Sequence, residues 1–407
     1  MKMLFTLAWR NLWRNRKRTL ITISSVLFAV LLAIVFISFE NGSYERMIDS
    51  MVKLSTGYIQ VQDVLYEEEP SIDNSLLYSK ELKETLAGFS DQISYIVPRI
   101  QNFALAATES QTRGSLVMGI DPMSETTMND LDRKLISGEF LQAGDDGILL
   151  AKGLAEILKR YTGDTLILLG QGFQGTTAAG RFAVKGIVDL KIPEMNNNTI
   201  YMSLSRAQWF YGADDRLTSL IIMPVNPDKT HQLAAAIAKK TDPEWYNVIT
   251  WENLLADLLK LMKFDQAGTK IMVMILYIVI AFGLFGTIIT MMIERQREFA
   301  MLISIGLKRS QLAVVSFFET LMISFIGVIA GMIASIPVVI WFRLHPIQLT
   351  GEMAQAMIDY GFEPVMPFSA DPQVFVSQAQ IVLAISMITF IYPAYKIFRL
   401  NITEAKQ

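Results

Sequence analysis

A glycine-rich stretch, Gly170-x-Gly172-x-x-Gly175, is the first group of residues whose spacing could do chemistry. It is the spacing of a dinucleotide-binding turn, which follows a strand, opens a helix and is followed by an acidic residue about 20 positions later. Here the next residues, 181–188, alternate in polarity like a second strand. The stretch therefore predicts a β-hairpin with a glycine-rich tip, and we expect no nucleotide there.

Residues for other catalytic chemistry are scarce. The chain has no cysteine and two histidines, His231 and His345, which lie far apart in sequence. This excludes disulfides and thiolate metal sites and leaves little for zinc or a Ser-His triad. The acidic clusters at 67–69 and 145–146 are typical of solvated turns, and no Gly-x-x-x-x-Gly-Lys-[Ser/Thr] motif is present. We expect no catalytic residue, no metal site and no cofactor on this chain, and no nucleic acid as a partner.

The hydropathy of the chain predicts a membrane protein. Hydrophobic residues make up 52% of it and charged residues 18%. A membrane-spanning helix needs about 20 apolar residues. Four windows meet this requirement, and Glu319 is the one charged residue within them: 19–39, 271–293, 310–342 and 372–395.

The distribution of charge predicts the orientation, because Lys and Arg collect on the cytoplasmic side of membrane helices. Residues 1–18 contain six basic and no acidic side chains. Residues 40–270 contain 22 basic and 31 acidic side chains, net −9, and residues 343–371 contain one basic and four acidic, net −3. We therefore expect a multi-pass membrane protein with both termini and the 294–309 loop in the cytoplasm.

The predicted fold is a membrane α-helical protein of four transmembrane helices, with a large α+β extracytoplasmic domain between the first and second. A helical pattern at 252–263 runs toward the second span and suggests a stalk. The predicted order is an amphipathic cytoplasmic interfacial helix at 1–18, a transmembrane helix at 19–39, the extracytoplasmic domain at 40–270, a transmembrane helix at 271–293, a cytoplasmic coupling helix at 294–309, a transmembrane helix at 310–342, an extracytoplasmic loop at 343–371, a transmembrane helix at 372–395 and a cytoplasmic tail at 396–407.

Two interpretations of residues 1–18 are compatible. Leu12 and the tryptophans Trp9 and Trp13 fall near one helical face, with arginine and lysine on the other. Such a helix lies in the plane of the membrane interface. The same residues also serve as a basic flank that sets topology.

The loop at 294–309 is the segment with the clearest mechanism. Its middle predicts a short amphipathic helix with charged residues on both sides. Such a helix could dock into a groove of a cytoplasmic partner or rest on lipid, and both interpretations stay open. The residues assigned to contact with a partner are Glu294, Arg295, Arg297, Glu298, Phe299, Leu302, Ile303 and Gly306.

Several motifs in this order resemble FtsX/MacB-type (type VII) ABC transporter permeases. Glu294-Arg-x-Arg-Glu298, followed by Gly306 and Arg309-x-Gln311, resembles the coupling segment of that family. Three further segments resemble its amino-terminal helix, outer core domain and closing signature: Leu7-Ala-Trp-Arg-Asn-Leu12, Gly163-Asp-Thr-Leu166 and Tyr392-Pro-Ala-Tyr-Lys-Ile-Phe-Arg-Leu400. The resemblance covers almost the whole chain. It departs from the family at Ile303, where a basic residue is common.

The resemblance implies a permease subunit of the bacterial inner membrane that pairs with a second permease subunit, either another copy or a paralogue. Two copies of a separate cytoplasmic ABC ATPase would grip the coupling helices, and ATP and Mg²⁺ would bind to that ATPase. The size of the outer region is most similar to the lipoprotein-releasing LolC/LolE group. By analogy this region would divide into a porter-like module, about 40–105 and 215–270, and an inserted module, about 106–214.

In that group, the hairpin that follows the Gly163–Leu166 strand is a hook for a periplasmic lipoprotein carrier. The resemblance places the hook at Gly170, Gln171, Gly172, Phe173, Gln174 and Gly175. We expect Phe173 to be its exposed apolar contact. An ordinary hairpin turn is the alternative.

Two features lie within the third membrane helix. Glu319 is ten residues, about 15 Å along a helix, beyond Arg309, which places it toward the cytoplasmic interface. An acid at this depth either pairs within the protein or takes part in substrate handling or energy coupling. Gly327-x-x-x-Gly331 permits close helix approach, either inside one subunit or across a dimer.

The predicted function is extraction of lipoproteins from the inner membrane and their transfer to a periplasmic carrier. Candidates for a cavity that holds the acyl chains are Phe28, Val35, Phe36 and Phe39, which could equally face membrane lipids. Two alternatives are a MacB-like tripartite efflux permease and an FtsX-like mechanotransmitter that activates cell-wall hydrolases. A standalone membrane enzyme is disfavoured for want of a catalytic constellation.

Overall fold

The computed structural model describes residues 2–14, 16–190, 192–359 and 364–399. The chain forms two compact units. A helical unit contains residues 1–46, 260–348 and 365–407, and an α+β unit contains residues 47–259 and 349–364. Two long helices, α2 and α10, belong to both units because the boundaries at 46 and 260 fall inside them. Of the predicted segments, the tail at 396–407 lies outside the described residues from position 400 onward.

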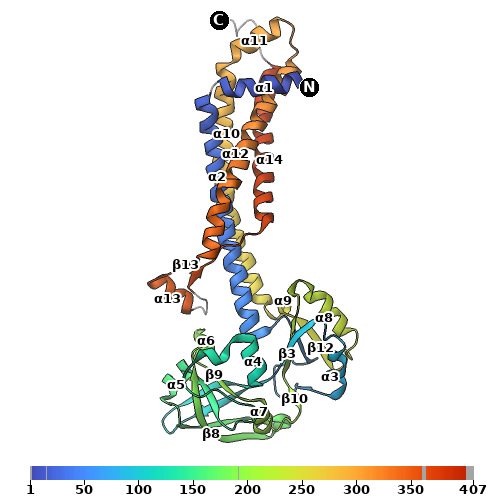
Figure 1. Cartoon of the computed structure of the whole chain (residues 1–407), viewed down its shortest axis with the longest axis vertical. Coiled ribbons are helices and arrows are strands. Elements are labelled where there is room, and N and C mark those ends of the chain that lie inside the picture. The colour runs from blue at the N-terminus through green and yellow to red at the C-terminus, as the bar shows by residue number, and fades with distance from the viewer. Residues whose placement is uncertain (1, 15, 191, 360–363, 400–407) are drawn as a thin grey trace. The chain divides into compact units, whose positions relative to one another are not determined.

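Among its described residues, the helical unit contains four helices that are long and apolar enough to span a membrane. Figure 1 shows them alongside one another, and they share one apolar core. They are α2 (Arg16–Met51), α10 (Ala256–Glu294), α12 (Arg309–Leu344) and α14 (Pro372–Phe398). Each predicted span lies inside one of these helices, so the predicted number and order of membrane helices are confirmed.

Shorter elements precede, connect or follow these helices along the chain. At one end of the helices, called here the α1 end, are α1 (Lys2–Arg14) and α11 (Gln296–Ser304). The connection between α12 and α14 contains β13 (Ile347–Gln348), α13 (Glu352–Asp359) and β14 (Val365–Met366), and β13 pairs antiparallel with β14.

The packing of α1 differs from the expected grouping of its apolar residues. Ala8 and Leu12 are buried, whereas Trp9 and Trp13 are exposed and their rings meet edge to face at 5.8 Å. The side chain of Leu12 joins a small core with Ile23 of α2 and Ile323 of α12. One face of α1 therefore packs on the chain's own helices, and the tryptophans lie on another.

The glycine pair of α12 packs inside one chain. A Cβ atom at Gly327 would lie 2.7 Å from Val26 Cβ, and one at Gly331 would lie 2.8 Å from Val30 Cβ. Both valines belong to α2. These glycines let α12 approach α2 closely. Of the two expected roles, the structure therefore shows helix packing within this chain rather than across a dimer.

The α+β unit is built on a mixed ten-stranded sheet. Its order is β12-β1-β11-β3-β4-β9-β6-β8-β5, and β7 pairs with β3 and β8. Two pairs, β4 with β9 and β6 with β8, are parallel. The bounds are β1 (Ile59–Asp63), β3 (Ile93–Ala107), β4 (Thr112–Ile120), β5 (Leu135–Gly138), β6 (Ile148–Ala151), β7 (Thr165–Gln171), β8 (Thr177–Val188), β9 (Thr199–Ser203), β11 (Ser219–Pro224) and β12 (Tyr246–Thr250). A separate pair joins β2 (Leu76–Leu77) and β10 (Arg216–Leu217).

Short helices connect these strands and cover two apolar cores. One core gathers residues between 72 and 213, and the other joins residues 59–89 to residues 217–237. The helices are α3 (Lys80–Ala87), α4 (Pro122–Asn129), α5 (Lys152–Leu158), α6 (Pro193–Asn196), α7 (Leu204–Tyr211), α8 (Thr230–Ala238) and α9 (Trp251–Leu254), with a π-helix, η1 (Val52–Thr56), after α2 and 3₁₀ turns η2 (Leu131–Lys134), η3 (Phe173–Gly175) and η4 (Pro227–Lys229).

The sequence pattern locates the hairpin strands β7 and β8, whereas it does not reveal β3. Pro98 interrupts this strand, and proline is a signal against a central strand because it has no N–H. The structure accommodates it because the pairing of β3 with β4 begins only at the next residue, Arg99. The expected stalk helix at 252–263 is also divided, since α9 ends at Leu254 and α10 begins at Ala256.

Candidate functional site

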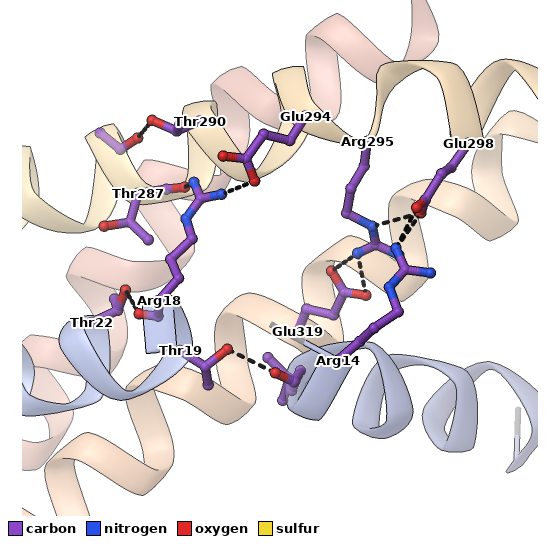
Figure 2. Close-up of polar contacts among 12 residues, drawn as sticks. Arg14, Arg18, Thr19, Thr22, Thr287, Thr290, Glu294, Arg295, Glu298 and Glu319 are labelled. Atoms are coloured by element: carbon purple, nitrogen blue, oxygen red, sulfur yellow. Dashed lines mark hydrogen bonds and ion pairs between the residues drawn. The ribbon is translucent and has the colours of Figure 1, made fainter. Parts of the chain in front are cut away.

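A cluster of ion pairs lies at the α1 end of the helical unit. Figure 2 shows how α1, the first turn of α2, the end of α10, α11 and α12 meet there. Three arginines and three glutamates form the cluster: Arg14, Arg18, Arg295, Glu294, Glu298 and Glu319. Sequence reasoning identified the acidic residues and Arg295 but not their partners on α1 and α2.

Glu319 is the centre of this cluster. Arg295 Nη1 donates to both carboxylate oxygens of Glu319 at 2.8 Å, and Asn11 Nδ2 donates to Oε1 at 2.8 Å. The glutamate is 3% exposed. A buried ion pair repays its desolvation cost only when geometry and further hydrogen bonds are favourable, and both conditions hold here. Of the two roles considered for Glu319, the structure shows the pairing.

Two outer ion pairs connect the amino-terminal residues to the segment before and within α11. Arg14 contacts Glu298 at 2.5 Å, and Arg18 contacts Glu294 at 2.5 Å. Arg18 also donates to the carbonyl of Thr287 on α10 at 2.7 Å. Exposed pairs of this kind contribute at most about 1 kcal/mol each. The Arg14 pair therefore orients α1 against α11, and the Arg18 pair orients α2 against the end of α10. The buried Glu319 pair supplies the stronger link.

The apolar face of α11 turns toward the chain itself. Phe299 and Ala300 are buried, and they pack with Leu312 of α12 and Ile397 of α14. Leu302 and Ile303 are partly buried against the same core. The expectation that Phe299 docks in a partner's groove is therefore wrong, because its own chain covers it.

A different stripe of α11 is exposed. Met301 is 63% exposed and Ile305, directly after the helix, is 77% exposed. Arg297 lies on the same side, four residues before Met301, and its side chain is also exposed. Residues four apart share a helical face. Met301 was missed because an apolar pattern cannot distinguish the buried face of a short helix from the exposed one.

Gly306 ends α11. Its φ of +102° is a conformation that favours glycine. Its N–H bonds to the carbonyl of Ile303 at 3.1 Å, and the N–H of Leu307 bonds to that of Leu302 at 3.0 Å. These two bonds form a Schellman motif, completed by apolar contact between Leu307 and the α11 core. Gly306 therefore shapes the end of α11.

We expect Gly306→Ala to lower the free energy of unfolding of the helical unit by about 1–2 kcal/mol, because a Cβ is strained at positive φ. Thermal unfolding of the full chain in detergent measures this loss. Gly268→Ala is the control, since Gly268 lies in α10 and a Cβ added there would meet nothing within 4 Å. Equal unfolding temperatures for the two variants would contradict the prediction.

The contact between α1 and α11 is expected to weaken in acid. The Arg14 guanidinium, and then Arg295, hold the pKa of Glu298 below its ordinary value of 4.5. A depressed folded-state pKa adds stability above the unfolded value, and that stability is lost as pH falls through the folded value. Hydrogen exchange of α1, corrected for its intrinsic rate, should therefore show less protection below about pH 4.5. The same pH dependence in Glu298→Gln would contradict this.

An apolar cavity of about 430 Å³ lies beside the far half of α2 and α10. Of the predicted cavity residues, Val35, Phe36 and Phe39 line it, whereas Phe28 does not and is 62% exposed. The other lining residues are Leu32, Ala33, Met272, Val273, Leu276, Ile347, Met366 and Phe368. Every one of these side chains is apolar, so the cavity suits hydrocarbon.

The glycine-rich stretch forms the predicted hairpin. Strands β7 and β8 pair antiparallel from Thr165 opposite Ala183 to Gln171 opposite Thr177. Phe173 is only partly exposed, packs on the neighbouring core, and has the guanidinium of Arg216 4.2 Å from its ring. The expectation that Phe173 is an exposed apolar contact is therefore wrong.

Exposed apolar side chains instead lie on the strands beside the hairpin tip. Leu105 of β3 is opposite Leu169 of β7, and both are exposed. Phe103 lies two residues before Leu105, and Ile167 lies two residues before Leu169, so both are on the same face of the sheet. Both are also exposed. These four residues form an apolar sheet face next to Gly170–Gly175. Among the residues described, no group of three histidine or acidic side chains is placed to hold a metal.

Two family models match the chain. The MacB-like periplasmic core domain matches residues 19–240, and the FtsX-like permease C-terminal region matches residues 270–402. Similar curated proteins include the lipoprotein-releasing system transmembrane protein LolC of Neisseria meningitidis, 23% identical over 331 residues that cover 78% of this chain and 76% of that protein. A protein of the same name from Xylella fastidiosa is 25% identical over 331 residues, 79% of each chain.

Two solved structures align with about half of the chain. The extracellular domain of the ABC-type transporter YknZ from Gram-positive bacteria covers 48% of this chain and 100% of that one, with 13% identity and a TM-score of 0.35. The periplasmic region of MacB from Actinobacillus actinomycetemcomitans covers 51% of this chain and 95% of that one, with 13% identity and a TM-score of 0.35.

Proposed function

Because this chain belongs to the MacB-like periplasmic core domain family, we propose that it is the permease subunit of an ABC transporter that releases lipoproteins from a bacterial inner membrane. The FtsX-like region supports the permease role, and the LolC relatives support lipoprotein release. The observation that carries the proposal is the arrangement of α11. This short helix has an exposed stripe, and a buried ion pair joins the start of the helix to α12.

The exposed stripe of α11 is the docking surface for the ATPase. Met301 and Ile305 would enter an apolar groove, and Arg297 would face its rim. A two-copy cytoplasmic ATPase binds ATP and Mg²⁺, and its movement reaches this chain through α11. Arg295 and Glu319 then pass the movement to α12 because they join the two helices by two hydrogen bonds. The α1 end and both termini face the cytoplasm in this proposal.

Cargo binding belongs to the opposite half of the helices. The cavity beside Val35, Phe36 and Phe39 has the apolar lining that acyl chains need. Acyl chains that enter this cavity from the bilayer stay in an apolar environment, whereas their exposure to water would cost about 0.8 kcal/mol per CH₂ group. A second permease subunit, either another copy or a paralogue, would complete the path for the lipoprotein among the membrane lipids.

The hairpin at 170–175 is proposed to receive the periplasmic lipoprotein carrier. Gln174 and Gly175 at its tip are exposed and polar or small. The apolar sheet face formed by Phe103, Leu105, Ile167 and Leu169 takes the role first expected of Phe173. Phe103→Asp should weaken carrier binding, whereas Phe173 substitutions should act through the stability of the hairpin.

Substitution of the α11 stripe tests ATPase docking. We expect Met301→Asp and Ile305→Asp each to weaken association with the ATPase at least tenfold, about 1.4 kcal/mol, because a carboxylate would be buried without a partner. Binding of purified ATPase to the chain in nanodiscs measures this. Met353→Asp is the matched control, since Met353 is similarly exposed on α13. Unchanged affinity for both stripe variants would contradict the docking surface.

Purification in mild detergent, with mass spectrometry of bound proteins and lipids, tests the overall function. We expect an ABC ATPase together with triacylated lipoprotein, and the same sample shows whether the second permease subunit is a copy or a paralogue. Recovery of the ATPase with an outer-membrane channel or a cell-wall hydrolase, and without acylated cargo, would leave the permease role and overturn lipoprotein release.

A further inference from the structure

A second cavity lies between α2, α10 and α14, at the end of the helices opposite α1. Its volume is about 600 Å³, within the range of pockets that hold small molecules. It lies within the helical unit and is lined by Ile37, Glu40, Asn41, Gln266, Thr269, Lys270, Val273, Met274, Tyr277, Asp371, Gln373, Val374, Ser377, Gln378 and Ile381. Unlike the acyl-chain cavity, it is lined by both charged and apolar side chains.

The lining changes from charged to apolar along the helices. Glu40, Lys270 and Asp371 come from three different helical segments, each at the boundary of an apolar span. Met274 lies one helical turn from Lys270 toward the α1 end, and Ile381 lies ten residues, about 15 Å, from Asp371 in the same direction. This is the order of a membrane interface, in which a headgroup layer a few ångströms thick gives way to hydrocarbon.

A polar pair lies within the apolar part of the cavity. Gln378 is 3% exposed, and Tyr277 donates its hydroxyl hydrogen to Gln378 Oε1. Burial of an amide is costly unless it is hydrogen-bonded. The pair joins α10 to α14 on the α1 side of the charged residues, at the depth where the ester groups of a lipid would lie.

We propose that this cavity binds a zwitterionic phospholipid of the phosphatidylethanolamine class. Lys270 pairs with the phosphate, and the carboxylates of Glu40 and Asp371 pair with the ammonium group. Asn41 and Gln266 lie at the outer level and donate to the phosphate oxygens. The Tyr277–Gln378 pair lies at the depth of the ester groups, and the acyl chains follow Met274 and Ile381.

The charges select this class of lipid. Two carboxylates against one lysine leave the charged rim net negative, which disfavours an anionic headgroup. A lipoprotein's acylated amino terminus has no phosphate that could pair with Lys270. The site therefore belongs to a resident lipid of the bilayer. It adjoins the proposed cargo cavity, with which it shares one lining residue, Val273.

Native mass spectrometry of the full chain tests the proposal. The protein is incubated with equimolar phosphatidylethanolamine and phosphatidylglycerol that carry identical acyl chains. We expect one retained phosphatidylethanolamine, at least fivefold over phosphatidylglycerol. Lys270→Gln should reduce its retention at least fivefold, whereas Lys263→Gln, an exposed lysine on α10 outside the cavity, should not.

A cavity-filling variant provides the second measurement. Ser377→Phe places a ring in the cavity and should abolish retention, whereas Ala384→Phe, at an exposed position on the same helix, should leave it unchanged. Preference for phosphatidylglycerol, retention by Ser377→Phe equal to that of the unmodified chain, or displacement of the lipid by a triacylated lipoprotein would each overturn the proposal. None of these outcomes bears on ATPase docking.

Discussion

Arg295→Met is expected to destabilise the helical unit by about 3–5 kcal/mol, because it leaves the carboxylate of Glu319 buried without its charged partner. Arg295 is the residue that donates two hydrogen bonds to this carboxylate, and Asn11 alone cannot replace the lost charge. The double variant Arg295→Met/Glu319→Leu should recover most of the stability, since apolar residues of similar volume often substitute well for a buried ion pair. Thermal unfolding of the full chain in detergent measures both effects.

The double variant also separates the two roles considered for Glu319. If the pair carries force from α11 to α12, the recovered protein should bind the ATPase normally yet release lipoprotein poorly for each ATP hydrolysed. If the pair is only structural, release per ATP should recover together with stability. Arg10→Met, at an exposed position on α1, controls for the loss of one basic residue. Full stability of the Arg295→Met single variant would contradict the burial argument.

A second large effect is expected from Glu125→Gln in the α+β unit. Arg99 and Glu125 form an ion pair whose side chains are 3% and 1% exposed. The guanidinium donates to both carboxylate oxygens, at 2.9 and 2.6 Å, and to the carbonyl of Ser55 in η1 at 2.6 Å. Asn129 donates to the same carboxylate at 2.6 Å. Loss of the charge at Glu125 leaves Arg99 buried and unpaired, at a cost of about 3–5 kcal/mol.

Glu125→Gln should destabilise mainly the residues through which the chain enters the α+β unit. Arg99 of β3 holds η1 through Ser55, and Gly57 then turns the chain into β1 with a φ of +62°. Hydrogen exchange of the full chain should show loss of protection in residues 52–63 together with a lower unfolding temperature. Glu156→Gln, an exposed glutamate on α5, should change neither. Loss of protection in residues 165–188 alone would point to a different weak region.

The membrane helices and the sheet differ in how far local patterns predict them. Each span is an apolar run longer than about 20 residues, and the bilayer imposes that length whatever the neighbours are. Residues 181–188 of β8 are predictable because they alternate in polarity, and β7 precedes them as a short apolar run. Strand β3 is not, because Pro98 is acceptable only through its register with β4, and register is a property of two strands together.

By itself, the sequence determined the number and order of the membrane helices, the hairpin at 166–186 and the absence of a Walker motif, because each depends on residues close together in the chain. Only the tertiary structure decided which side chains are paired or covered. Asn11 and Glu319 are 308 positions apart, and Phe299 is buried because α12 and α14 lie over it. The periodicity of a nine-residue helix marks its apolar face but not its neighbours. Only the tertiary structure therefore decides that Met301 and Ile305 form the exposed stripe of α11.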